Sequence, residues 1–160
     1  MFSLNVYQER RQRLKALMPE KSLAIVAAAA EVIRNRDAEY PFRQSSDFWY
    51  LTGFTEPDAV LVIGPGQPDR LFVRPKHPEQ EVWTGRRMGP DHVKHRLGID
   101  QGYPLEALDT ELKTLLAEIA WVEYPFGCQK STAIVDQAIK AKGLRSRRSD
   151  LLSHRADLSR

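Results

Sequence analysis

The nearest approach to a metal site in this sequence is a pair of histidines with an aspartate beside it. Asp91, His92 and His95 place two imidazoles three residues apart, near one face of a helix. Imidazole and carboxylate groups are common metal ligands. However, the chain has no His-Glu-x-x-His run, and no other carboxylate cluster completes a site. We therefore expect a surface helix here and assign no metal ligand.

Two other features that could do chemistry are interpreted as structural. Cys128 lies between Gly127 and Gln129 without a recognisable histidine partner, so we expect an incidental or buried thiol. Gly64-Pro65-Gly66 lacks the Gly-Lys-Ser/Thr ending of a phosphate loop, and its proline removes a backbone donor. This tripeptide predicts a hairpin turn. We assign no catalytic residue to the chain.

The most informative stretch runs from Glu39 to Ile63, where an arginine-glutamine pair, a polar turn, aromatic residues and a glycine precede an apolar strand. Four bulky apolar side chains in seven residues are what a core needs, which favours a structural role over a peptide-contacting surface. The side chains expected in the core are Phe48, Trp49, Leu51 and Phe54. The pair before them would satisfy buried carbonyls or a neighbouring carboxylate. The residues of this block are Arg43, Gln44, Ser46, Asp47, Phe48, Trp49, Leu51, Gly53, Phe54 and Glu56.

A second block, Glu81 to Gly89, carries Trp83 followed by Arg86 and Arg87 in a stretch rich in glycine and proline. A large aromatic residue on a loop is typical of an interface anchor. The alternative is a satellite core residue beneath a long loop, and the sequence leaves both open.

Helices and strands alternate along the chain. Apolar periodicity predicts helices over 6–18, 45–51, 105–119 and from Ser131 to about Gly143, with Ser131 as the N-cap. Apolar runs predict strands over 23–26, 59–63, 70–74 and 120–124, of which the middle two form a hairpin. Residues 31–42 are expected to be loop, and 75–104 short helices joined by loops. This alternation predicts a layered α/β sandwich with a mixed sheet.

Composition and charge set limits on the function. The net charge of +3 comes wholly from residues 143–160, and residues 1–142 carry equal numbers of acidic and basic side chains. A nucleic-acid domain usually has a basic face on its folded body, so a solvated linker is expected here rather than a phosphate-binding tail. The start lacks a secretion signal, no apolar run could span a membrane, and a single cysteine fits a reducing compartment. Cytoplasmic location is therefore expected, with no membrane or nucleic-acid partner.

The two blocks together resemble the N-terminal domain of bacterial aminopeptidase P, a metallopeptidase that removes a residue preceding proline. The resemblance spans roughly residues 7–142. It implies a three-layer α/β/α sandwich with a mixed β-sheet, as in the creatinase/prolidase N-terminal domains. The expected organisation is a domain over 1–143 and a basic linker over 144–160, leading toward a catalytic domain that this chain lacks.

The resemblance also implies that catalysis and substrate contact are assigned to different domains. In this family catalysis takes place in the following domain, at a dinuclear metal centre, usually manganese, so no cofactor is expected in this chain. A tryptophan matching Trp83 reaches a neighbouring subunit's active site, which makes Trp83, Arg86 and Arg87 the substrate or interface candidates. The expected partners are the protein's own catalytic domain, neighbouring subunits of a homo-oligomer and proline-containing peptides. A free-standing interaction module with the same fold is the alternative.

Overall fold

Six strands form one mixed sheet in the part of the chain that the computed structural model describes, which is residues 3–30, 42–77, 79, 87–125, 128–141 and 154–157. Their order across the sheet is β4-β3-β2-β1-β5-β6. The strands are β1 (Ser22–Ala27), β2 (Val60–Ile63), β3 (Arg70–Val73), β4 (Gln101–Pro104), β5 (Trp121–Tyr124) and β6 (His154–Asp157).

Strand β1 lies at the centre of the sheet and pairs in two directions. It is antiparallel to β2 and parallel to β5. The β2–β3 pair is the predicted antiparallel hairpin, while β3 pairs with β4 in parallel. The mixed sheet expected from the alternation of elements is therefore confirmed.

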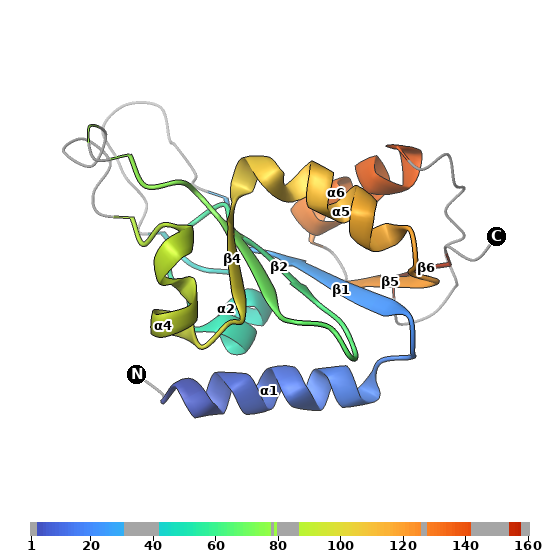
Figure 1. Ribbon diagram of the computed structural model, residues 1–160, viewed down its shortest axis with the longest axis horizontal. Coiled ribbons are helices and arrows are strands. Elements are labelled where there is room, and N and C mark those ends of the chain that lie inside the picture. Colours follow the sequence, from blue (N-terminus) through green and yellow to red (C-terminus); the bar gives the residue numbers. More distant parts are fainter. Residues whose placement is uncertain are drawn as a thin grey trace.

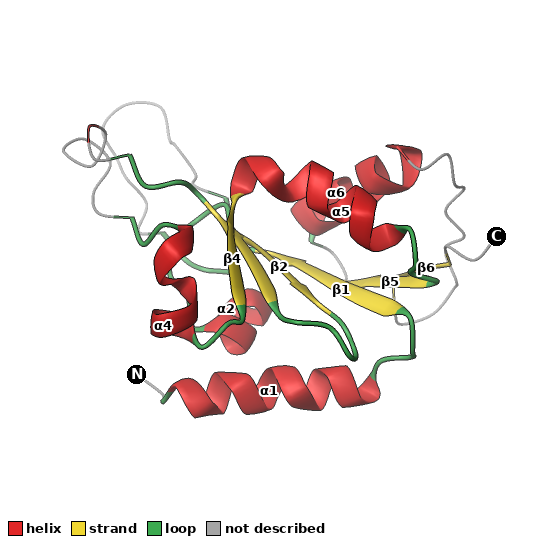
Figure 2. Ribbon diagram, in the orientation of Figure 1, coloured by secondary structure: helices red, strands yellow, loops and turns green. Residues whose placement is uncertain are grey.

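Helices cover both faces of the sheet (Figures 1 and 2). One face carries α1 (Leu4–Leu17), α2 (Ser46–Thr52) and α4 (Val93–Leu97), which follows the short 3-10 helix η1 (Pro90–His92). The other carries α5 (Leu108–Leu116), preceded by η2 (Leu105–Ala107), and α6 (Gln129–Ala141). This arrangement confirms the three-layer α/β/α sandwich.

The alternating side chains of the strands divide the core into two halves. Leu23, Ile25 and Ala27 of β1 pack toward α5 and α6, whereas Ala24 and Val26 pack on the opposite face. All six residues of β1 are buried, because helices cover both sides of it. A strand buried on both faces is continuously apolar in sequence, as β1 is from Leu23 to Ala27.

Strand β4 was not expected, since its region was predicted to contain only short helices and loops. Gly102 and Pro104 break the apolar pattern that would mark a strand. Gly102 is needed because η1 and α4 pack directly on it: an added Cβ would lie 2.9 Å from Val93 Cβ and still closer to the Pro90 carbonyl. Gly102 thus weakens the strand pattern in the sequence and also allows η1 and α4 to pack closely on β4.

Helix α6 begins at Gln129, two residues before the predicted N-cap Ser131. Ser131 is fully buried inside the helix, and its Oγ accepts a hydrogen bond of 3.0 Å from the backbone N–H of Ala27, at the end of β1. The predicted capping role is therefore wrong, because this hydroxyl fastens the helix to the sheet instead of closing the helix end. The predicted end at Gly143 lies outside the described residues.

The C-terminal segment contains structure as well. Four of the residues assigned to a linker, His154–Asp157, form β6 and pair with β5 in antiparallel fashion. Backbone pairing with an edge strand does not require an apolar pattern, so no apolar period marks this strand in the sequence. Among the helices of the described residues, none is both long enough and apolar enough to cross a membrane.

Candidate functional site

Gln44 is the centre of a polar junction at the end of the sheet where β1 finishes and β2 starts. Its Oε1 accepts hydrogen bonds from the backbone N–H groups of Ala29, at 2.8 Å, and Ser45, at 3.0 Å. Its Nε2 donates to the carbonyls of Phe54, at 3.1 Å, and Glu56, at 2.9 Å. The amide thereby uses both its oxygen and its nitrogen and ties three stretches of backbone together.

Glu56 connects this junction to the second sequence block. Its Oε1 accepts a hydrogen bond of 2.7 Å from the backbone N–H of Met88. Met88 packs against the buried cluster to which α2 and α4 contribute, and it is followed by Gly89, whose φ is +71°. The arginine-glutamine block and the tryptophan block, 32 residues apart at this contact, are therefore joined by a charge-assisted hydrogen bond.

Asp58, two residues further on, joins the hairpin to α6. Its carboxylate pairs with the Arg74 guanidinium and accepts a hydrogen bond of 2.7 Å from Lys130 Nζ. Its own N–H donates to the carbonyl of Ala29. Burial, followed by the positive charge of Arg74, lowers the pKa of Lys130 below its ordinary value of 10.5.

The aromatic residues of the first block have divided roles. Phe48 and Phe54 are buried, with their rings in edge-to-face contact at a centroid separation of 6.4 Å. Trp49 was expected in the core, but it is 37% exposed and packs edge-on against Tyr7 of α1, at 6.0 Å. The core-facing side of α2 belongs to Phe48, Leu51 and Thr52, and Trp49 lies about 100° round the helix from Phe48.

The other members of the block are mostly at the surface or in a turn. Arg43, Ser46 and Asp47 are exposed. Gly53 ends α2 with a φ of +67°, and an added Cβ there would lie 2.6 Å from Tyr7 Cζ. This position needs glycine both for its backbone conformation and for the room taken by the tyrosine ring.

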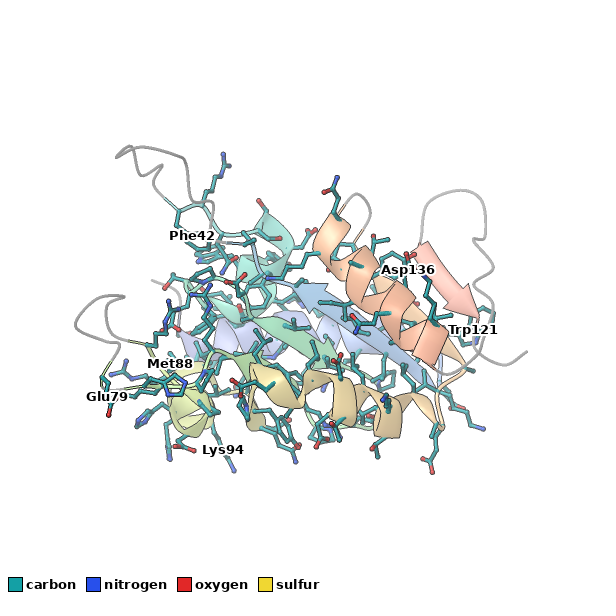
Figure 3. All side chains as sticks on the ribbon, turned by 90° about the horizontal axis from the view of Figure 1, so that it is seen from above. Phe42, Glu79, Met88, Lys94, Trp121 and Asp136 are labelled. Atoms are coloured by element: carbon teal, nitrogen blue, oxygen red, sulfur yellow. The ribbon has the colours of Figure 1, made fainter. Side chains whose placement is uncertain are left out.

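Two of the three substrate or interface candidates, Trp83 and Arg86, lie outside the described residues. Arg87 is half-buried and immediately precedes Met88, the residue held by Glu56. Figure 3 shows Phe42, Glu79 and Met88 at one end of the molecule, away from Trp121 at the other. The candidate site is therefore this end of the domain, where Gln44, Glu56 and Asp58 link separate segments by hydrogen bonds and an ion pair.

Within the described part of the chain, the histidine pair does not belong to a group of metal ligands. Asp91, His92 and His95 are exposed on η1 and α4. Across the described ranges, no group of three or more histidine, cysteine, aspartate or glutamate side chains is placed to hold a metal ion. Cys128 is half-buried just before α6 and is not part of a disulfide.

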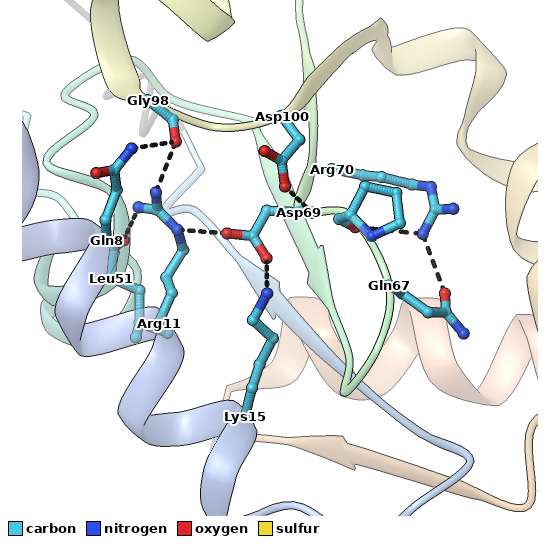
Figure 4. Close-up of polar contacts among 10 residues, drawn as sticks. Gln8, Arg11, Lys15, Leu51, Gln67, Asp69, Arg70, Gly98 and Asp100 are labelled. Atoms are coloured by element: carbon cyan, nitrogen blue, oxygen red, sulfur yellow. Dashed lines mark hydrogen bonds and ion pairs between the residues drawn. The ribbon is translucent and has the colours of Figure 1, made fainter.

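Sequence reasoning missed a second polar cluster, at the opposite end of β3. Arg11 of α1 is completely buried, although a charged side chain is usually exposed. Its guanidinium donates to Asp69 Oδ2, at 2.8 Å, and to the carbonyls of Leu51, at 2.7 Å, and Gly98, at 3.0 Å (Figure 4). Lys15 adds a contact of 2.7 Å to Asp69 Oδ1. The signal that could have found it is a charged position on the same helix face as Tyr7 and Leu14.

This cluster supports the fold rather than the candidate site. A polar cleft opens beside it, away from the end that carries Gln44 and Glu56, and is lined by Asn5, Gln8, Glu9, Gln12, Arg13, Asp69, Gly98 and Asp100. The Arg11 contacts hold α1 against the ends of α2 and α4, which in turn fix the first layer of the sandwich.

Comparison with known proteins identifies the family. The model of the "Aminopeptidase P, N-terminal domain" family matches residues 7–121. The Xaa-Pro aminopeptidase of Escherichia coli K12 is 43% identical over 114 residues, covering 69% of this chain and 26% of that protein. The Xaa-Pro aminopeptidase of Haemophilus influenzae is 39% identical over 116 residues, covering 71% of this chain and 27% of that protein.

A solved structure gives the same result for the fold. Zinc-substituted E. coli aminopeptidase P in complex with product matches with a TM-score of 0.81 and 38% identity, over 87% of this chain and 33% of that one. This chain thus spans about a quarter of the length of the curated relatives and a third of the solved chain. The chain belongs to the aminopeptidase P N-terminal domain family and is an N-terminal domain of the Xaa-Pro aminopeptidase type.

Proposed function

We propose that this chain is the non-catalytic N-terminal domain of a proline-specific metalloaminopeptidase. The observation that carries this proposal is that relatives named Xaa-Pro aminopeptidase match it over only about a quarter of their own length. The described residues also offer no metal ligand set. In the full-length protein, hydrolysis would take place in a following domain.

The metal belongs to that following domain in this proposal. The relative solved in a zinc-substituted form with product supports a metal-dependent hydrolase. We propose a dinuclear manganese centre, which supplies an activated water as the nucleophile. The residues described in this chain do not fit such a centre, so we derive no chemical step through it. A cytoplasmic location is proposed as well, since a single cysteine suits a reducing compartment.

We further propose that this domain contributes to a homo-oligomer and narrows the pocket for proline-containing peptides. Trp83, Arg86 and Arg87 are the candidates for this contact. The hydrogen bond from the backbone N–H of Met88, next to Arg87, to Glu56 supports the proposal. A side chain that anchors an interface needs a backbone held in one position.

Two measurements test the proposed function. The DNA downstream of codon 160 should continue into a metal-binding domain, and the full-length protein should hydrolyse Xaa-Pro peptides when supplied with manganese. A stop codon at this point, with no adjacent catalytic frame, would instead favour a free-standing interaction module.

In the full-length enzyme, Trp83→Ala should raise KM for longer proline peptides while leaving the melting temperature of the protein unchanged. Removing an anchor at the rim of a pocket affects binding more than stability. Trp49→Ala is the matched control, because Trp49 packs on Tyr7 and its loss should lower the melting temperature. An equal loss of melting temperature in both variants would make Trp83 a core residue and exclude the proposed role.

A further inference from the structure

Lys130, near the start of α6, shares a carboxylate with an arginine. Its Nζ lies 2.7 Å from Asp58 Oδ1, and the Arg74 guanidinium pairs with the other oxygen, Oδ2. The three residues come from α6, from the turn before β2 and from the position just after β3. Two cations and one carboxylate give this Lys130 cluster a formal charge of +1.

The surroundings of Lys130 favour the reactive form of its amine. A lysine attacks an acyl group only as the free amine, and desolvation and a neighbouring cation both favour that form. Burial is the first cause that lowers the pKa of Lys130 and Arg74 is the second, while Cys128 acts in the opposite direction. The amine nevertheless remains accessible to a reagent, since 33% of the side chain is exposed.

A second lysine makes the same kind of contact and provides an internal comparison. Lys15 Nζ lies 2.7 Å from Asp69 Oδ1, and Arg11 binds the other oxygen of that carboxylate. Only 11% of the Lys15 side chain is exposed, against 33% for Lys130. A carboxylate shared with an arginine is thus common to both lysines, and accessibility to a reagent separates them.

We propose that Lys130 is a site of covalent acylation, and that its acyl donor is an acyl phosphate. The positive charge of the Lys130 cluster attracts the anionic phosphate group of such a donor. This inference does not rest on the proposed function, since every residue that it uses belongs to the described part of this chain.

The step is an acyl transfer without a change of oxidation state. The free amine of Lys130 attacks the carbonyl carbon, a C–N bond forms, and the C–O bond to phosphate breaks. Inorganic phosphate leaves with the electron pair of that bond. Attack leaves an extra proton on the nitrogen, which Asp58 Oδ1, at 2.7 Å, accepts and passes to water. The amide product is uncharged, so the ion pair that joins α6 to Asp58 is lost.

Site-resolved mass spectrometry of this chain, incubated with acetyl phosphate, tests the inference. Lys130 should be acetylated at least about threefold faster than the exposed Lys113 and Lys140, because burial and Arg74 keep more of it as the free amine. Lys15 should react more slowly than Lys130, because less of its side chain is exposed. Acetylation of Lys130 that is no faster than that of Lys113 would overturn the inference.

Two variants test the role of the cluster. Arg74→Leu should reduce the rate at Lys130 to about that at Lys113, because it raises the pKa of Lys130 and removes a charge that attracts the donor. Arg70→Leu, at the other end of β3, is the matched control and should leave the rate unchanged. An undiminished rate in Arg74→Leu, or an equal loss in both variants, would overturn the inference.

A neutral donor separates recognition of the phosphate from the reactivity of the amine, without any change to the chain. With an N-hydroxysuccinimide ester of acetic acid, the rate advantage of Lys130 over Lys113 should fall by at least about twofold, because this donor is not attracted by the cluster. An equal advantage with both donors would overturn the assignment of an acyl phosphate.

Cys128 is the other nucleophile close to Lys130 in the sequence. Cys128→Ser should leave the rate of acetylation at Lys130 within about twofold, because the proposed attack is made by the amine itself. Loss of acetylation in this variant would overturn the inference, since the thiol would then be the first acceptor of the acyl group.

Discussion

Arg11 is a charged side chain that has no contact with solvent, and its partners explain how this is tolerated. The guanidinium reaches one carboxylate and two backbone carbonyls on three separate segments. Arg11→Met should lower the free energy of unfolding by about 3–5 kcal/mol, because it leaves Asp69 and both carbonyls without this donor. Urea denaturation of the chain measures the change.

Two variants sharpen this prediction. Arg11→Lys should recover little of the loss, because an ammonium group cannot reproduce the planar fork of donors. Arg13→Met, on the exposed side of the same helix, should stay within about 0.5 kcal/mol of the unaltered chain. Equal losses at positions 11 and 13 would contradict the structural role given to Arg11.

Lys130 gives a prediction about pH. Its pKa is lowered by burial and then by Arg74, so the folded state releases this proton at lower pH than the unfolded state, whose value is 10.5. Between the two pKa values the folded state binds fewer protons, and the contribution of Lys130 to the free energy of unfolding rises with pH. At a pH below both pKa values Lys130 is charged in both states, and the cost of burying this charge lowers the free energy of unfolding in full. Arg74→Leu should therefore raise the pKa of Lys130.

Nuclear magnetic resonance of the Lys130 side chain measures this change directly. Arg70→Leu is the control, since Arg70 lies at the other end of β3, near Gln67. A pKa of Lys130 that stays constant or falls in Arg74→Leu would show that Arg74 does not act on this amine.

At the scale of elements, a single hydroxyl links α6 to the central strand. Ser131 Oγ accepts from the N–H of Ala27, and both residues are buried. Ser131→Ala should cost about 1–3 kcal/mol, because it leaves a buried backbone donor without a partner. Thr132→Ala removes a hydroxyl that donates to the carbonyl of Cys128, the residue just before the same helix, and should cost less. Thermal unfolding of the two variants compares them, and a larger loss for Thr132→Ala would contradict this docking role.

The elements with a clear apolar period were predicted from the sequence. The leucines of α5 recur on one face, and the strands of the hairpin are short apolar runs between glycines and prolines. β4 escaped prediction because an edge strand with Gly102 and Pro104 has no such period. Ser131 was misplaced because the residue type that caps a helix can also bond across to a strand.

The candidate site was predictable only in part, for a related reason. Gln44 was expected to satisfy buried carbonyls, and it does so at Phe54 and Glu56. The link from Glu56 to Met88 depends on how two distant segments fold together, which local patterns do not report. Likewise, the burial of Arg11 depends on carbonyls supplied by residues 40 and 87 positions away.

At the scale of the whole molecule, the chain should unfold cooperatively. Two buried clusters share one sheet, and the helices of each layer are fastened to it by Arg11 and Ser131. Calorimetry should show one transition whose calorimetric and van't Hoff enthalpies agree. A broad profile without a transition would mean that another domain completes the core.

The chain alone should not hydrolyse Xaa-Pro peptides, with or without added manganese. The described residues provide no ligand set for an ion, and the proposed chemistry belongs to a following domain. A peptidase assay and titration calorimetry with manganese check this. Tight stoichiometric binding of the metal, lost in the His92→Ala, His95→Ala double variant, would contradict the prediction.

The position of β1 between β2 and β5 has a consequence for the order of events on the ribosome. β1 can pair with β2 once residue 63 has emerged, but pairing at its other edge must wait for residues 121–123. At ribosomal rates this delay of about sixty residues lasts roughly 3–12 s. During that interval the nascent chain displays the strand edge that later pairs with β5, Ser22 to Ala24, which is a template for pairing with other chains. Synthesis speed between β2 and β5 therefore influences how much of this domain reaches the folded state.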